Sequence, residues 1–81
     1  MSTETTTAAA FKTAIAALDM EQKRHSEISS AAFFAMLREE RGGNTVAMAE
    51  ARTAMVAADL EVRKAHNAMC VLSEMLLLLA A

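Results

Sequence analysis

The sequence predicts an all-α protein that folds as an antiparallel hairpin of two long helices. Its composition favours helix, because 19 of the 81 residues are Ala and seven are Met, whereas Pro, Trp and Tyr are absent. One pair of adjacent glycines, Gly42 and Gly43, divides the chain into two halves of similar length. On both sides of this pair, apolar residues recur in steps of three and four, which is the spacing of one helix face.

Length and charge limit what the chain can be. The 81 residues suffice for one domain, residues 1–81, and are too few for a large catalytic α/β fold. The net charge of −2 is too close to neutral to attract a polyanion through bulk charge. With a single cysteine there is no disulfide framework.

The first helix is expected over residues 7–41. Thr7 ends a run of threonines whose hydroxyls suit a helix N-cap, and no glycine or proline follows until Gly42. Arg38 and Arg41 lie near its end, where a cation interacts favourably with the helix dipole.

An alternative divides this first segment into two helices near His25. Ser26 could cap a new helix that begins at Glu27. Residues 21–24, which precede the break, are all good helix formers, and none of them forces a stop. We therefore favour one continuous helix and keep three helices as the alternative.

The turn is expected at residues 42–44 and the second helix at residues 45–80. A glycine that follows a helix readily adopts the left-handed conformation that ends it. The side-chain oxygen of Asn44 or of Thr45 can then cap the next helix. Neither Gly nor Pro occurs after Gly43, so nothing interrupts this second helix.

A coiled-coil seam is predicted along the second helix, where apolar residues keep steps of three and four over more than four heptads. The seam consists of Met48, Ala51, Met55, Ala58, Val62, Ala65, Met69, Leu72, Leu76 and Leu79. The corresponding stripe on the first helix consists of Phe11, Ala14, Leu18, His25, Ile28, Ala32 and Ala35, with Ile15 and Met36 beside it. Alternation of Met with Ala predicts that the two helices approach closely.

The apolar surface exceeds what one pair of helices can bury. Folding at Gly43 brings the apolar segments 8–18 and 68–78 together, and near the C-terminus apolar residues surround the whole helix. Phe33 and Phe34 are adjacent, so they point about 100° apart and cannot both face one partner. We therefore predict assembly into an oligomeric helical bundle. The residues expected at the interface are Phe11, Ile15, Leu18, Phe33, Phe34, Met69, Leu72, Leu76 and Leu79.

The two histidines do not match the metal spacing of helical bundles. In di-metal carboxylate bundles a Glu stands three residues before the His, but Gln22 precedes His25 and Arg63 precedes His66 at this distance. We expect no metal site. A polar layer of Gln22 and His25 that fixes the register of the helices is the interpretation we favour.

A basic quartet at the middle of the hairpin is the candidate site for binding RNA or nucleotide phosphates. It consists of Lys23, Arg24, Arg63 and Lys64. Acidic residues share this belt, with Asp19 four residues before Lys23 and Asp59 four residues before Arg63, and no aromatic residue is present for base stacking. We therefore expect a solvated, salt-bridged surface and no nucleic-acid partner.

Cys70 lacks the surroundings of a catalytic nucleophile. Such a residue needs a base, an oxyanion donor and a concave pocket, and its nearest cationic neighbour in sequence is His66, one turn away. We expect Cys70 to be a small buried hydrophobic residue. The chain is accordingly predicted to be no enzyme and to use no cofactor.

The sequence shows neither a secretion signal nor a membrane span. Residues 1–7 are polar and acidic, and the uninterrupted apolar segment 75–81 is far shorter than the ~20 residues that a spanning helix needs. Glu74 is predicted to point outward, and no Lys or Arg follows Lys64 to attract anionic lipid. We expect no membrane partner and a cytoplasmic location, although signal-independent export would leave no trace in the sequence.

Three functions are compatible with these patterns. The leading hypothesis is a non-enzymatic structural or assembly protein that binds copies of itself to form a homo-oligomer or a polymer. The second is a small adaptor, chaperone or inhibitor whose exposed helix face docks on a larger protein. The third, which has the weakest support, is an RNA- or nucleotide-binding hairpin that uses the basic quartet.

Overall fold

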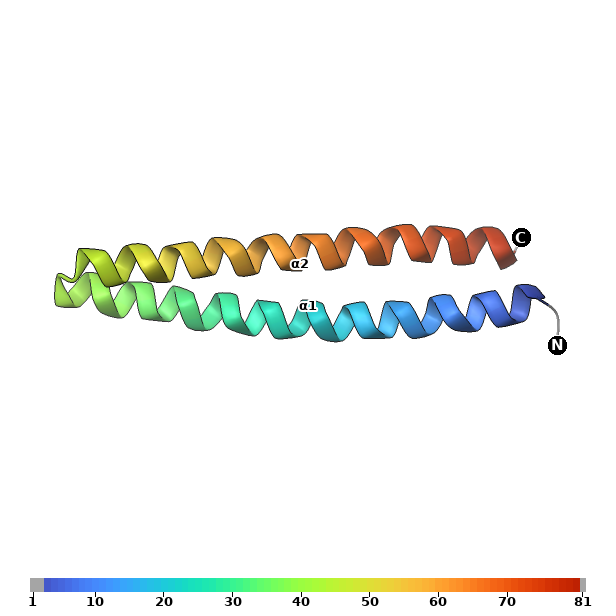
Figure 1. Cartoon of the computed structure of the whole chain (residues 1–81), viewed down its shortest axis with the longest axis horizontal. Helices are drawn as coiled ribbons and strands as arrows, with labels where there is room; N and C mark the ends of the chain where they lie inside the picture. Colours follow the sequence, from blue (N-terminus) through green and yellow to red (C-terminus); the bar gives the residue numbers. More distant parts are fainter. Residues whose placement is uncertain (1–2, 81) are drawn as a thin grey trace.

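The computed structural model describes residues 3–80, which form two helices and the turn between them. Helix α1 spans Thr3–Gly42 and helix α2 spans Thr45–Ala80. The helices lie side by side in a rod of 61 × 15 × 13 Å, and the start of α1 and the end of α2 lie at the same end of the rod (Figure 1). We call this the open end. The predicted all-α hairpin is confirmed.

The turn follows from the glycine pair and the asparagine after it. Gly43 has a φ of +73°, a conformation that a residue with a Cβ rarely adopts. Its amide donates to the Glu40 carbonyl at 3.2 Å and the Asn44 amide donates to the Glu39 carbonyl at 3.0 Å, which is a Schellman motif. Asn44 Oδ1 accepts a hydrogen bond from the Ala47 amide at 3.0 Å. Of the two candidate caps, Asn44 is therefore the residue that caps α2.

Helix α1 begins at Thr3, four residues before the predicted start. Thr7 is not its cap, because the Thr7 hydroxyl donates to the Thr3 carbonyl at 2.8 Å inside the helix. The Thr13 hydroxyl makes the same kind of bond to the Ala9 carbonyl at 3.0 Å. Threonine hydroxyls that find partners in the preceding turn do not end a helix, so the threonine run belongs to α1.

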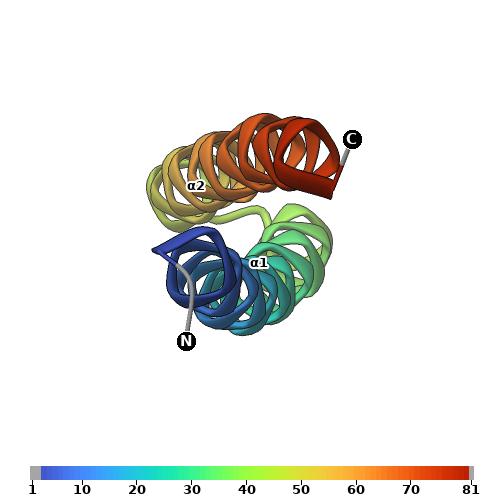
Figure 2. The same cartoon turned by 90° about the vertical axis from the view of Figure 1, so that its right-hand side faces the viewer.

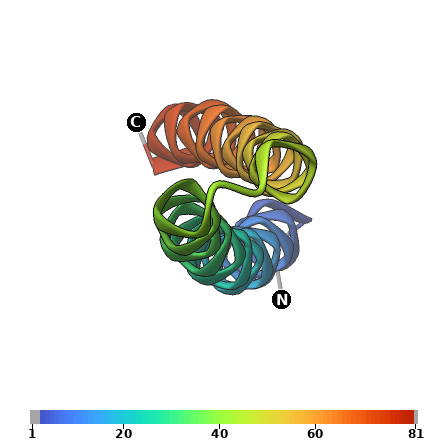
Figure 3. The same ribbon diagram turned by 90° about the vertical axis from the view of Figure 1, so that its left-hand side faces the viewer.

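Helix α1 is continuous through His25, so the alternative with three helices is wrong. Ion pairs support this segment, because Lys23 Nζ lies 2.9 Å from Asp19 Oδ2 and Arg24 Nη2 lies 2.7 Å from Glu21 Oε2. The end-on views show that the two helices are inclined to each other, both from the open end (Figure 2) and from the turn (Figure 3). Such an inclination keeps a seam of heptad spacing in contact along the rod.

The contact between the helices is thin and depends on small residues. Among residues 3–80, only Ala58 and Ala65 are buried, with exposed fractions of 4% and 6%. Both belong to the predicted seam of α2, whose other members between Met48 and Leu76 are half-buried. The backbones therefore approach at alanine while the larger side chains are covered only in part.

Ser29 occupies the position in the α1 stripe that was predicted for Ile28. Ile28 is 45% exposed, whereas Ser29 is half-buried and its hydroxyl donates to Asp59 Oδ1 on α2. Asp59 thus bonds across the hairpin and does not form the predicted ion pair with Arg63 on its own helix. Ile28 is predicted to lie at the contact because it is apolar, and this prediction is wrong. The hydrogen bond between Ser29 and Asp59 fixes the height of one helix relative to the other at this point.

Candidate functional site

The candidate functional surface is the apolar surface that the hairpin leaves exposed. The chain exposes 5940 Å², against about 4,700 Å² for a compact monomer of 8.7 kDa. Its radius of gyration is 18.2 Å, against about 12 Å for a compact chain of this length. The large exposed apolar residues are Met20, Ile28, Phe33, Phe34, Val46, Val56, Leu60, Val71, Met75, Leu77, Leu78 and Leu79.

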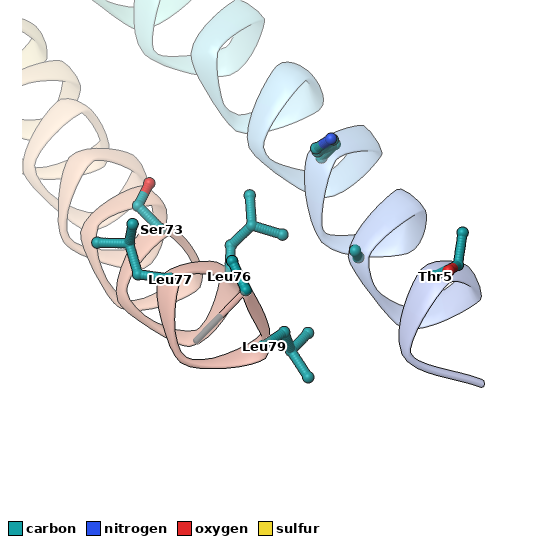
Figure 4. Close-up of a pocket in the computed structure, with 8 residues that line it drawn as sticks. Thr5, Ser73, Leu76, Leu77 and Leu79 are labelled. Carbon is teal, nitrogen blue, oxygen red and sulfur yellow. The ribbon is translucent and has the colours of Figure 1, made fainter. Parts of the chain in front are cut away.

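An apolar groove lies between the two helices at the open end. Its volume is about 600 Å³. It is lined by residues from the first turns of α1, including Lys12, and by residues from the last turns of α2 (Figure 4). Leu76 and Leu79 project from α2 toward α1, whereas Leu77 points away from α1 (Figure 4). The last turns of α2 therefore present leucine both to the hairpin contact and to the outside.

A second groove at the open end lies between the same two helices, on the opposite side of the hairpin from the first groove. It has a volume of about 370 Å³ and is lined by Phe11 of α1 and by Met75 and Leu78 of α2, among others. Leu77 and Leu78 are consecutive, so they point about 100° apart around α2 and line different grooves. Each side of the open end is thus apolar.

Most residues predicted to form the assembly interface lie at the contact inside the hairpin. Phe11, Ile15 and Leu18 of α1 and Met69, Leu72 and Leu76 of α2 are half-buried, and Leu79 is more exposed at the open end. These side chains hold the two helices together. Val71, Met75, Leu77 and Leu78 are exposed and are not among the predicted interface residues, although Val71, Met75 and Leu78 have the helical spacing of a second face.

Phe33 and Phe34 are both on the surface, although their adjacency requires only that one of them points away from α2. Their exposed fractions are 43% and 66%. The two rings meet edge to face, with centroids 5.8 Å apart and an interplanar angle of 64°. The Phe33–Phe34 pair is therefore an exposed aromatic cluster near the turn.

Three members of the basic quartet form ion pairs on their own helix. Besides the pairs of Lys23 and Arg24 described above, Lys64 Nζ lies 3.2 Å from Glu61 Oε1. Arg63, the fourth member, is exposed. The belt is therefore largely salt-bridged. The arrangement leaves little uncompensated positive charge for a phosphate backbone.

His25 and Gln22 are half-buried at the middle of the hairpin, where the polar layer is predicted. His25 Nε2 lies 3.4 Å from Glu21 Oε2. Arg24 donates a hydrogen bond to Glu21 and lowers the pKa of that carboxyl, and the charges of Arg24 and His25 act in the same direction. In the part of the chain that the structure describes, no three His, Cys, Asp or Glu side chains are grouped to hold a metal ion.

The prediction that Cys70 is buried is wrong. Cys70 is exposed, and its Sγ lies 3.6 Å from His66 Nε2 one turn earlier on the same helix. It follows Met69, which occupies the seam, so its own side chain points away from α1. Position relative to the seam decides the exposure of this residue.

The bond between Ser29 and Asp59 should contribute measurably to stability. We expect Ser29→Ala and Asp59→Ala each to lower the free energy of unfolding by about 1–2 kcal/mol, because the bond crosses between helices and involves a carboxylate. The double variant should cost about 1 kcal/mol less than the sum, as measured by urea unfolding followed by circular dichroism at one protein concentration. Thr53→Ala is the matched control, since that hydroxyl bonds only to the Ala49 carbonyl of its own helix. Additive costs would contradict the assignment.

Comparison of the chain with protein-family models, with curated proteins and with solved structures returned no match. No helix within residues 3–80 combines the length and apolar character needed to cross a membrane.

Proposed function

We propose that this chain is a non-enzymatic assembly protein whose partner is another copy of itself. The observation that carries the proposal is an imbalance in burial. Inside the hairpin the buried side chains of residues 3–80 are Ala58 and Ala65, whereas Val71, Leu77 and Leu78 on α2 are more than half exposed. Burial of apolar surface is the main driving force of folding and association, and a two-helix contact supplies little of it.

Charge also favours association between copies. A net charge of −2 sets up only weak repulsion between two identical rods. The ion pairs of the central belt neutralise Lys23, Arg24 and Lys64 within each hairpin, which lowers the charge repulsion between two stacked hairpins. A helical bundle built from two or more hairpins would cover the apolar residues that each leaves exposed.

The absolute mass of the purified protein tests this proposal. Light scattering over a hundredfold dilution series should give a defined multiple of the 8.7 kDa chain at the higher concentrations, with the helicity followed in parallel by circular dichroism. A helical monomer at every concentration would refute self-assembly. An aggregate that dissolves only with a second protein would instead favour the adaptor, for which the exposed Met20 and Met75 would be suitable contacts.

A further inference from the structure

One side of the hairpin is rich in alanine, and we call it the alanine face. On α1 its residues recur in steps of four and three: Ala10, Ala14, Ala17, Glu21, Arg24, Ile28, Ala31, Ala35 and Arg38. On α2 they recur in steps of three and four: Ala47, Glu50, Ala54, Ala57, Glu61, Lys64, Ala68, Val71, Met75 and Leu78. Nine of these nineteen positions are Ala. The rest are four large apolar residues and six charged ones, three acidic and three basic. Its charged groups are therefore balanced in sign.

We propose that the alanine face binds the alanine face of a second copy, with the two turns at the same end. This deepens the proposed self-assembly and rests on it. The two-fold axis then runs along the rod, so that α1 of one copy lies antiparallel to α2 of the other, and the dimer is a closed four-helix bundle. Residues at the same height along the rod meet across the interface.

The charges at the middle of the alanine face are already paired within each hairpin. Glu21 and Lys64 line one shallow groove there, together with Glu61. Glu21 pairs with Arg24 and Glu61 pairs with Lys64, each on its own helix. In the dimer the ion pairs of one copy lie within about a turn of those of the other, so no uncompensated charge is brought together there.

Arg38 and Glu50 distinguish a dimer with the two turns at the same end from a dimer with the turns at opposite ends. The Ser29–Asp59 bond between the helices sets their level, and counting nine residues along each helix toward the turn leads to Arg38 and Glu50. With the turns at the same end these two exposed residues meet across the interface. With the turns at opposite ends, Arg38 would lie near Thr7 and Glu50 near Met75, so the charge of Glu50 would be placed against an apolar side chain.

Large side chains of the alanine face meet small ones in the same arrangement. Val71 and Leu78 near the end of α2 are exposed, and at the level that the Ser29–Asp59 bond sets they stand opposite Ala17 and Ala10 on α1. Nearer the turn, the exposed Ile28 on α1 stands within a turn of Ala57 on α2. Large residues that fill spaces left by alanine are what close packing between helices requires.

The opposite side of the hairpin does not fit a second copy in this way. The same two-fold arrangement would bring Lys23 of one copy against Arg63 of the other, which are both positive. The alanine face has the necessary area, because a rod 61 Å long and about 15 Å wide offers on the order of 900 Å², compared with the ~800 Å² per partner of a standard interface.

Charge exchange at Arg38 and Glu50 tests the proposal. Both residues are exposed, so Arg38→Glu and Glu50→Arg should leave the hairpin folded while each raises the dimer Kd on the order of tenfold. An equimolar mixture of the two single variants should regain the Kd of the unaltered protein. In the mixed dimer the introduced glutamate of one copy faces the introduced arginine of the other, and the remaining Arg38 faces the remaining Glu50. Each chain in the mixture carries only one substitution, so recovery of the Kd on mixing can come only from contacts between two copies. Sedimentation equilibrium gives the three Kd values.

The position of the turns provides the second measurement. With Thr45→Cys in a Cys70→Ser background, spin labels at the two turns should be roughly 20–30 Å apart in the parallel dimer. A separation near the 61 Å length of the rod, or mixing without rescue in a protein that still dimerises, would overturn the parallel arrangement and leave self-assembly standing. A protein that stays monomeric throughout would overturn both.

Discussion

Leu78→Asp should convert the assembly into monomers, whereas Leu77→Asp should leave its mass unchanged. These consecutive leucines are similarly exposed in the hairpin, at 77% and 71%, but only Leu78 belongs to the alanine face. Covering a leucine by a partner contributes about 1.5–3 kcal/mol, and a two-fold interface covers it twice. Loss of both contacts should raise the dimer Kd on the order of a thousandfold.

The pair of variants carries its own control. Neither leucine supports the contact between α1 and α2 to the extent that Leu76 does, because Leu76 is half-buried and projects toward α1 (Figure 4). Helicity at high protein concentration should therefore be similar in the two variants, and light scattering would report the mass of each. Equal dissociation by both substitutions would show that the interface is not confined to the alanine face. Dissociation by neither would show that the open end does not take part.

The hairpin itself was predictable because its determinants are local. Gly43 and Asn44 provide the left-handed residue and the cap that any such turn needs, and uninterrupted helix formers on both sides leave no other element. The start of α1 was not predictable in the same way. A threonine hydroxyl can cap a helix or bond to the preceding turn, and in the structure Thr7 does the latter.

The candidate site was harder to predict because apolar residues serve two surfaces. Periodicity finds the seam, but a chain that also associates carries apolar residues outside the seam, and hydrophobicity alone does not separate the two sets. For this reason the sequence predicts that Ile28 and Cys70 are interior, whereas both are exposed. Ser29 was overlooked because its place in the contact depends on Asp59, thirty residues away in the sequence.

The residues that were assigned to the assembly show the same ambiguity. Phe11 and Leu76 are apolar and lie near the ends of the chain, which is equally consistent with closing the hairpin and with joining two hairpins. Only the register between the helices shows which side of each residue is covered. Once Ser29 and Asp59 set that register, the second set of steps, which contains Val71, Met75 and Leu78, becomes visible as a separate face.

Ala65→Leu should lower the free energy of unfolding by about 1–3 kcal/mol, because Ala65 is buried where the two helices approach closely. A larger side chain there must push α1 away from α2. Ala16→Leu is the matched control, since Ala16 is exposed on α1, and it should change the stability by less than about 0.5 kcal/mol. Urea unfolding followed by circular dichroism, repeated at two protein concentrations, separates the hairpin contact from assembly. A stabilising Ala65→Leu would mean that the contact is underfilled, and the close approach at alanine would then not be what holds the two helices in register.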